Sequence, residues 1–263
     1  MTESIAAMYS MTLWNERQKS AGRESDFWNY GYWDANTRDA SGASQQLLDH
    51  LQSKFPTRGG QVLDVAFGKG ESTRQLCARF GADNVIGINI ASDQLEAARM
   101  RGVGCDLRVM DAAQMRFRDS MFDVILCVEA AFHFRTRARF LERARAALRP
   151  NGRLIMSDIL FRSGHGLPTE IFPTENVVHS IEEYRAHFAE AGFIEADLQI
   201  ERTMERQVVP YFLNLARAMR IWPHGNSQTV TQGAAKEDMW AIHFMLTRLL
   251  NILDCVVVVA TKR

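Results

Sequence analysis

The sequence has few cysteines and no long apolar run. Four cysteines occur among 263 residues and none forms a CxxC pair, so neither a disulfide framework nor a zinc site is predicted. The apolar run at 255–260 is far shorter than the roughly 20 residues that cross a bilayer. The N-terminal residues lack a basic segment followed by an apolar core, so no secretory signal is expected. We therefore expect a cytoplasmic protein that does not associate with membranes.

The sequence also lacks a surplus of charge of either sign, because 31 Lys and Arg residues balance 31 Asp and Glu residues. Non-specific binding of nucleic acid needs a basic surplus that displaces counterions from the phosphates. Neutrality therefore argues against nucleic acid as a partner, although it is compatible with a local basic patch. The length fits one large domain, or one domain with a sizeable insertion.

From about residue 61, short apolar runs alternate with helix-like segments, which is typical of a parallel sheet covered on both faces. The expected strands are 61–65, 84–89, 106–110, 122–128, 153–159, 194–202 and 256–261. The expected helices after the fourth strand are 136–148, 181–191, 208–221 and 235–252. Residues 161–173 are rich in Gly and Pro and predict a loop over the strand ends.

All five tryptophans lie outside this alternating part, in the N-terminal region and in the late helical pair. Together the two regions are expected to form an aromatic lid over the carboxyl edge of the sheet. The candidate lid residues are Tyr32, Trp33, Phe212 and Trp240. The alternative is that these aromatic side chains only attach the extra helices to the main domain.

The strongest local signal is the stretch 62–72, VLDVAFGKGES, which predicts a strand, a turn of small residues and a helix. Such a turn lets backbone N–H groups approach a ligand closely. A dinucleotide fingerprint would place glycine at the position of Ala66, so pyrophosphate binding is disfavoured. Asp64 would repel phosphate and suits a positively charged ligand, such as the ammonium group of an amino acid.

This stretch resembles the first motif of class I S-adenosylmethionine-dependent methyltransferases, an acidic residue followed by G-x-G-x-G, with Ala66 in place of the first glycine. The alanine is expected to be tolerated if its φ is negative. Further motifs follow in family order over about residues 58–160. By this resemblance, Asn89 and Gln94 contact the ribose of S-adenosylmethionine, Ile90 packs on its adenine, and Asp111 accepts from the adenine amino group.

The resemblance implies one complete set of cofactor-binding residues: Asp64, Ala66, Gly68, Gly70, Asn89, Ile90, Gln94, Asp111, Ala112 and Glu129. For Glu129 the implied partner is the methionine moiety, and the alternative is a cap on the next helix. Six arginines between residues 135 and 149 are expected to form the solvated face of a helix, with phosphate recognition as the alternative.

The segment 127–134, CVEAAFHF, resembles a loop of bacterial natural-product O-methyltransferases that act on macrolide and indolocarbazole sugars. The resemblance implies that His133 is the base for an acceptor hydroxyl, with Asp158 orienting it or sharing the role. Imidazole is basic and largely neutral near pH 7, which suits that task. The alternatives are a packed, hydrogen-bonded histidine and an aspartate that caps a loop.

Together these features predict an α/β protein, a Rossmann-like class I methyltransferase sheet with an added helical lid. The expected parts are an N-terminal helical cap at 1–57, the cofactor-binding core at 58–204, a helical lid at 205–252 and a final strand at 253–263 that inserts antiparallel. The expected reaction is methylation of a hydroxyl on a small, largely apolar natural product or glycoside. A C- or N-methyltransferase and a non-catalytic cofactor-binding protein are the alternatives. No metal site is expected, while magnesium assistance and a homo-oligomer stay open.

Overall fold

In the described part of the chain, residues 29–56, 60–163, 169, 172–218 and 251–263 of a computed structural model, a seven-stranded sheet forms the centre. Its strands are β1 (Val62–Val65), β2 (Val85–Asn89), β3 (Asp106–Val109), β4 (Phe122–Val128), β5 (Leu148–Phe161), β6 (Leu198–Arg202) and β7 (Leu253–Thr261). Their order is β3-β2-β1-β4-β5-β7-β6. The first five strands pair in parallel, and β7 runs antiparallel to both β5 and β6. This topology confirms the predicted Rossmann-like sheet and the antiparallel insertion of the last strand.

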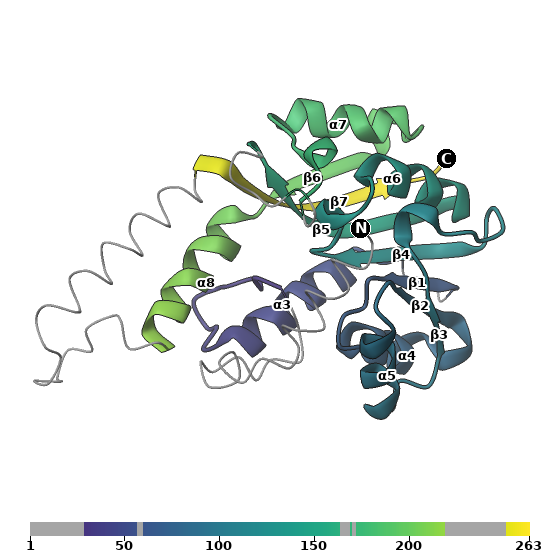
Figure 1. The fold of residues 1–263 in the computed structure, drawn as a ribbon, viewed down its shortest axis with the longest axis horizontal. Coiled ribbons are helices and arrows are strands. Elements are labelled where there is room, and N and C mark those ends of the chain that lie inside the picture. The colour runs from purple at the N-terminus through teal and green to yellow at the C-terminus, as the bar shows by residue number, and fades with distance from the viewer. Residues whose placement is uncertain (1–28, 57–59, 164–168, 170–171, 219–250) are drawn as a thin grey trace, which may run out of the picture.

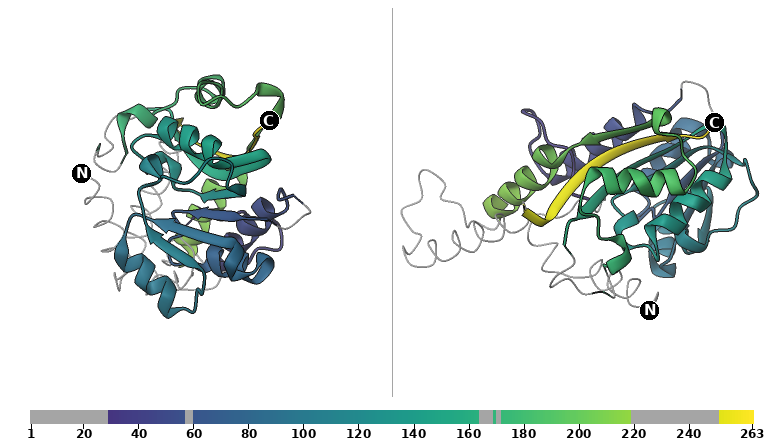
Figure 2. Two further views of the ribbon diagram at one scale, coloured as in Figure 1. Left: turned by 90° about the vertical axis from the view of Figure 1, so that its right-hand side faces the viewer. Right: turned by 90° about the horizontal axis from the view of Figure 1, so that it is seen from above.

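Helices cover both faces of the sheet (Figure 1). One side carries α3 (Ala40–Gln52), α4 (Glu71–Phe80) and α5 (Ser92–Met100), and the other carries α6 (Arg137–Ala147) and α7 (Ile181–Glu190). The last described helix, α8 (Met204–Ala218), follows β6 and extends away from the sheet. Figure 2 shows the same layers from the side and from above. Strands buried on both faces read as nearly continuous apolar runs, and all of β1 and β2 is buried accordingly.

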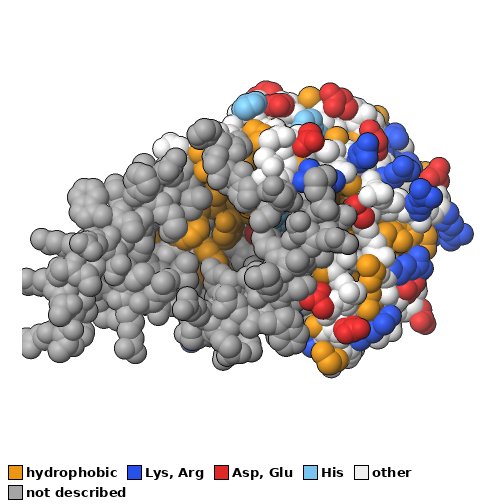
Figure 3. Space-filling model, in the orientation of Figure 1, with side chains coloured by type: hydrophobic (Ala, Val, Ile, Leu, Met, Phe, Trp, Pro, Cys, Tyr) orange, Lys and Arg blue, Asp and Glu red, His pale blue; other side chains and the backbone are white. Residues whose placement is uncertain are grey.

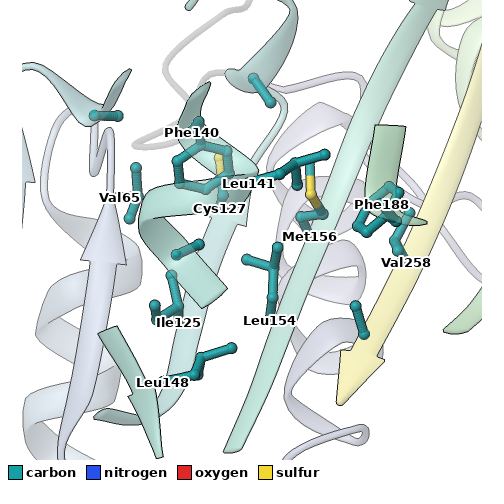
Figure 4. Close-up of a cluster of buried hydrophobic side chains, with 14 of the residues drawn as sticks. Val65, Ile125, Cys127, Phe140, Leu141, Leu148, Leu154, Met156, Phe188 and Val258 are labelled. Atoms are coloured by element: carbon teal, nitrogen blue, oxygen red, sulfur yellow. The ribbon is translucent and has the colours of Figure 1, made fainter. Parts of the chain in front are cut away.

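The hydrophobic core under α6 and α7 joins the middle strands to these two helices (Figure 4). Its fully buried side chains include Ile125, Phe140, Leu141, Leu154, Phe188 and Val258. A fully buried Leu or Phe side chain contributes roughly 1.5–3 kcal/mol through removal of its apolar surface from water. This core therefore fixes the ends of β4 and β5, from which the loops toward the carboxyl edge start.

Helix α3 lies in the segment predicted as an N-terminal helical cap, and it packs Leu47, Leu48 and Leu51 into a cluster with buried residues of β1, β4, β5 and β7. Strand β5 begins at Leu148 rather than at residue 153 and includes the Arg-Pro-Asn-Gly turn. Most of the helix predicted at 235–252 lies outside the described residues.

Candidate active site

A cavity lies at the carboxyl ends of β1, β2 and β4. The sheet order reverses between β1 and β4, which is where open α/β sheets bind ligands. Nine of the ten predicted cofactor-binding residues line this cavity: Asp64, Ala66, Gly68, Asn89, Ile90, Gln94, Asp111, Ala112 and Glu129. Motifs that are separated in the sequence therefore meet in one place.

Gly70 is the predicted residue that the structure does not bring to the described cavity lining. Its φ is +90°, and it immediately precedes α4. A Cβ atom built at this position would lie 2.6 Å from the Cβ of Ala98 in α5. Gly70 therefore serves the close packing of the turn on α5, and no ligand contact is needed to explain it.

Ala66 adopts a φ of +59°, so the condition under which the alanine was expected to be tolerated, a negative φ, is not met. Its N–H donates to the carbonyl of Ile88 at 2.8 Å, which fixes the turn against β2. The left-handed conformation costs an L-residue roughly 1–2 kcal/mol. The turn thus requires glycine-like geometry at a position occupied by alanine.

Replacing Ala66 by glycine should raise the free energy of unfolding by about 0.5–1 kcal/mol, because relief of the left-handed strain exceeds the chain entropy that glycine adds. Gly68→Ala is the matched control, since Gly68 has a φ of +57° and an added Cβ there would meet nothing within 4 Å. The free energy of unfolding of Gly68→Ala should fall by a similar amount, because the added methyl group introduces backbone strain without a steric clash. Urea unfolding measures both changes, and a loss of stability in Ala66→Gly would contradict the strain.

Asp64 connects β1 to the first turn of α4. The hydroxyls of Ser72 and Thr73 each donate to its Oδ2 at 2.7 Å. Burial raises the pKa of Asp64 to about 6, and the two hydroxyl donors oppose that rise. The group is therefore mostly ionised at neutral pH and places negative charge on the cavity wall.

The predicted ribose and adenine residues are held by short local hydrogen bonds. Asn89 donates through Nδ2 to Oε1 of Gln94 at 2.8 Å, so the two side chains form one polar unit. Asp111 accepts from the N–H of Ala113 at 2.9 Å and from Gln114 Nε2 at 2.8 Å. These bonds pre-orient the side chains at the cavity before any ligand binds.

His133 ends the short helical turn Ala131–His133 after β4 and lines the same cavity. It is buried, and its ring lies 4.0 Å from the ring of Phe132 and 5.2 Å from that of Phe172, centroid to centroid. His133 is therefore both packed against aromatic rings and placed at the cavity.

Asp158 is not among the described residues that line the cavity. Its carboxylate is buried, and its Oδ2 accepts from Arg137 Nε at 2.7 Å and from the hydroxyl of Tyr184 at 2.9 Å. Burial raises the pKa of Asp158, and the neighbouring Arg137 guanidinium opposes this. Asp158 is therefore held in a buried ion pair, and it is not among the described residues that line the cavity with His133.

Arg137 links Asp158 to the His133 loop through Asn176. Arg137 donates from Nη1 to the carbonyl of Asn176, and its backbone N–H donates to Asn176 Oδ1. Asn176 Nδ2 in turn donates to the carbonyls of Phe132 at 3.0 Å and Phe134 at 2.8 Å, which flank His133. This buried network fixes the loop that carries the histidine.

Two arginines depart from the solvated face predicted for the segment 135–149. Arg137 is fully buried, and Arg135 lines the cavity. Sequence reasoning missed Arg135 and also Asn29, which lines the cavity from the N-terminal region. Arg135 lies only two residues after His133, and this short spacing could have indicated that it reaches the same cavity. No sequence pattern around Asn29 indicated a position at the cavity.

The predicted lid residues lie in positions that favour the packing alternative. Tyr32 stacks on His50 of α3 at 4.7 Å between centroids, and Trp33 donates from Nε1 to the carbonyl of Tyr30. Phe212 packs against Tyr30 at 5.9 Å. None of Tyr32, Trp33 and Phe212 is among the described lining residues, and Trp240 lies outside the described part of the chain.

The described residues contain no group of three or more His, Cys, Asp or Glu side chains that could hold a metal ion. Within the same ranges, no helix is both long and apolar enough to cross a membrane. On the face shown in Figure 3, basic side chains are interspersed with acidic ones.

Comparison with known proteins finds similarity to methyltransferases. Residues 63–156 match the family described as methyltransferase domain. The chain is 33% identical over 178 residues to 27-O-demethylrifamycin SV methyltransferase of Amycolatopsis mediterranei, a match covering 62% of this chain and 65% of that protein. It spans between 51% and 65% of the length of the first three curated relatives that it matches.

Two solved structures share the fold. The cyclopropane synthase MmaA2 from Mycobacterium tuberculosis has a TM-score of 0.72 at 18% identity, with 98% of both chains covered. The phosphoethanolamine N-methyltransferase 2 of Haemonchus contortus in complex with S-adenosyl-L-methionine has a TM-score of 0.63 at 21% identity, covering 84% of this chain and 53% of that one. Residues 63–156 therefore match a methyltransferase domain, and S-adenosylmethionine is the cofactor that this match and the solved complex support.

Proposed function

We propose that this protein methylates a hydroxyl group of a small, largely apolar natural product or glycoside. The observation that carries the proposal is that His133 lines the same cavity as the cofactor motifs. The relative named above is, by its name, a methyltransferase of 27-O-demethylrifamycin SV, and this supports the choice of oxygen as acceptor.

The donor set of the cavity fits S-adenosylmethionine. Asn89, Gln94 and Asp111 offer hydrogen-bonding groups for ribose and adenine, and Ile90 offers an apolar surface for the base. Asp64 supplies negative charge toward a cationic ligand. When bound, the cofactor supplies an electrophilic methyl group.

Methylation of a hydroxyl forms a bond from its oxygen to the methyl carbon and releases the hydroxyl proton. His133 is the basic side chain that would accept this proton. Because the Asn176 network holds the carbonyls on both sides of His133, the imidazole has a fixed position relative to the cavity. Fixed position is the larger part of what such an enzyme contributes, since displacement at carbon needs the reacting atoms close and aligned.

Apolar side chains line the cavity near His133 in the sequence, beside the charged Glu129 and Arg135. They are Val128, Ala130 and Phe134, and the rings of Phe132 and Phe172 pack against the imidazole. Such a lining favours an acceptor with an apolar body and one or a few polar groups.

The proposal is tested by incubating the protein with methyl-labelled S-adenosylmethionine and small-molecule extracts of the producing cell. Mass spectrometry should identify a product that gains one labelled methyl group, and nuclear magnetic resonance should place that group on oxygen. Label on carbon or nitrogen would replace the proposal with one of the other methyltransferase classes. Label recovered only in nucleic acid would overturn the small-molecule assignment.

A further inference from the structure

Glu129 follows β4 in a left-handed conformation, with a φ of +45°. Its side chain is only 7% exposed, and it lines the cavity. A left-handed non-glycine residue persists only where surrounding contacts determine its conformation. One such contact is the backbone bond from Glu129 N–H to the carbonyl of Ser157 at 2.9 Å.

Both carboxylate oxygens of Glu129 accept hydrogen bonds from distant parts of the chain. Oε2 accepts from the backbone N–H of Tyr30 at 2.8 Å, and Oε1 accepts from Gln207 Nε2 of α8 at 2.7 Å. The amide of Gln207 is oriented by Thr203, whose hydroxyl donates to Gln207 Oε1 at 2.5 Å. Glu129, Gln207 and Thr203 are all buried.

The two segments held by Glu129 also contact one another. The N–H of Trp33 donates to the carbonyl of Arg206 at 2.8 Å, and the ring of Tyr30 packs edge-on against Tyr211 of α8 at 4.9 Å. Asn29, which precedes Tyr30, lines the cavity. Glu129 is therefore the point at which the β4 loop, residues 29–33 and α8 meet at the cofactor site.

We infer that Glu129 is a positioning residue that fastens residues 29–33 and helix α8 to the cofactor cavity, and that it acts through the Tyr30 amide and Gln207. The inference concerns the cofactor side of the site and does not depend on which atom of an acceptor is methylated. It adds a second task to a residue that the sequence assigned only to ligand contact or helix capping.

The ionised carboxylate suits this task better than the neutral acid, because it accepts from both N–H donors at once. Burial raises the pKa of Glu129 to about 8, and the negative Asp158 on β5 adds to the rise. Burial and then the charge of Glu129 raise the pKa of the Cys255 thiol on β7, and His133 lines the same cavity as Glu129. Ionisation of Glu129 therefore increases as pH rises through about 8, and a cation bound in the cavity would favour it.

Hydrogen exchange of the ligand-free, full-length protein tests the fastening directly. Glu129→Ala should speed amide exchange at residues 29–33 and in the first turns of α8, because both segments lose their buried acceptor. Glu205→Ala is the matched control, an exposed carboxylate of the same helix, and should leave both segments unchanged. Unchanged exchange in folded Glu129→Ala would overturn the inference. If that variant does not fold, Gln207→Met removes only the α8 donor, and it should speed exchange in α8 for the same reason.

Calorimetry supplies a readout that a merely structural role would not change. S-adenosylmethionine, with its cationic sulfonium, should bind the native protein more tightly as pH rises from about 7 to 9, by up to roughly tenfold relative to the isosteric Glu129→Gln variant. Titration of the ligand's own amino group is common to both proteins and cancels in this ratio. S-adenosylhomocysteine, which lacks the sulfonium charge, should show a smaller change. If the affinities of the native protein and of Glu129→Gln for S-adenosylmethionine changed identically with pH, the Glu129 charge would have no part in binding. Neither hydrogen exchange nor calorimetry requires a methyl acceptor.

Discussion

His133→Ala should lower the turnover of a hydroxyl acceptor by about 10²–10⁴-fold, the usual contribution of a positioned general base. Affinity for S-adenosylhomocysteine should change little, because the predicted cofactor contacts come from other residues of the cavity. Steady-state kinetics with the acceptor found by labelling gives the first quantity, and calorimetry gives the second.

The matched control is His179→Ala. It removes an exposed imidazole whose Nδ1 lies 2.9 Å from the carbonyl oxygen of Arg162. That variant should retain native turnover. A loss of less than threefold in His133→Ala would remove the histidine as base and favour an acceptor that needs no proton removal.

Arg137→Leu should lower the free energy of unfolding by about 3–5 kcal/mol, the typical result of removing one partner of a buried ion pair. The substitution leaves the Asp158 carboxylate buried opposite Tyr184 without its cation, and it removes the donor to Asn176. Because Arg137 opposes the raised pKa of Asp158, its loss should raise that pKa further. The folded variant then binds a proton that the unfolded chain does not, so its deficit should shrink as pH falls.

Urea unfolding at several pH values measures this deficit. Arg143→Leu on the same helix is the control. Because Arg143 is exposed, this substitution should lower the free energy of unfolding by less than about 0.5 kcal/mol. Adding Asp158→Asn to Arg137→Leu should recover part of the loss, because the unpaired charge is then absent. A deficit independent of pH, with no recovery in the double variant, would assign the loss to packing alone.

The strands and the cofactor motifs were predictable because their signals are local. The run VLDV, the small-residue turn and the acidic positions after the strands each depend on residues within a few positions of one another. The parallel order of the strands then brings Asp64, Asn89 and Asp111 to one cavity without further information.

The remaining features depend on contacts between residues that are far apart in the sequence. Arg137 is charged and lies among other arginines, so its burial follows only from Asp158 and Asn176, which come 21 and 39 residues later. Tyr30 and Gln207 are 99 and 78 residues away from Glu129. Ala66, with its left-handed φ, likewise bonds to Ile88, 22 residues later in the sequence. No local pattern encodes such pairs.

The place of β7 between β5 and β6 bears on how the protein is made. Strand β6 pairs with β7 in the sheet, and β7 is formed by residues 253–261. During synthesis on a ribosome, β5 therefore exposes an unpaired edge while about a hundred further residues are added, and such edges invite contacts with other chains. Chaperone occupancy of the nascent chain should accordingly persist until this late strand has emerged from the exit tunnel.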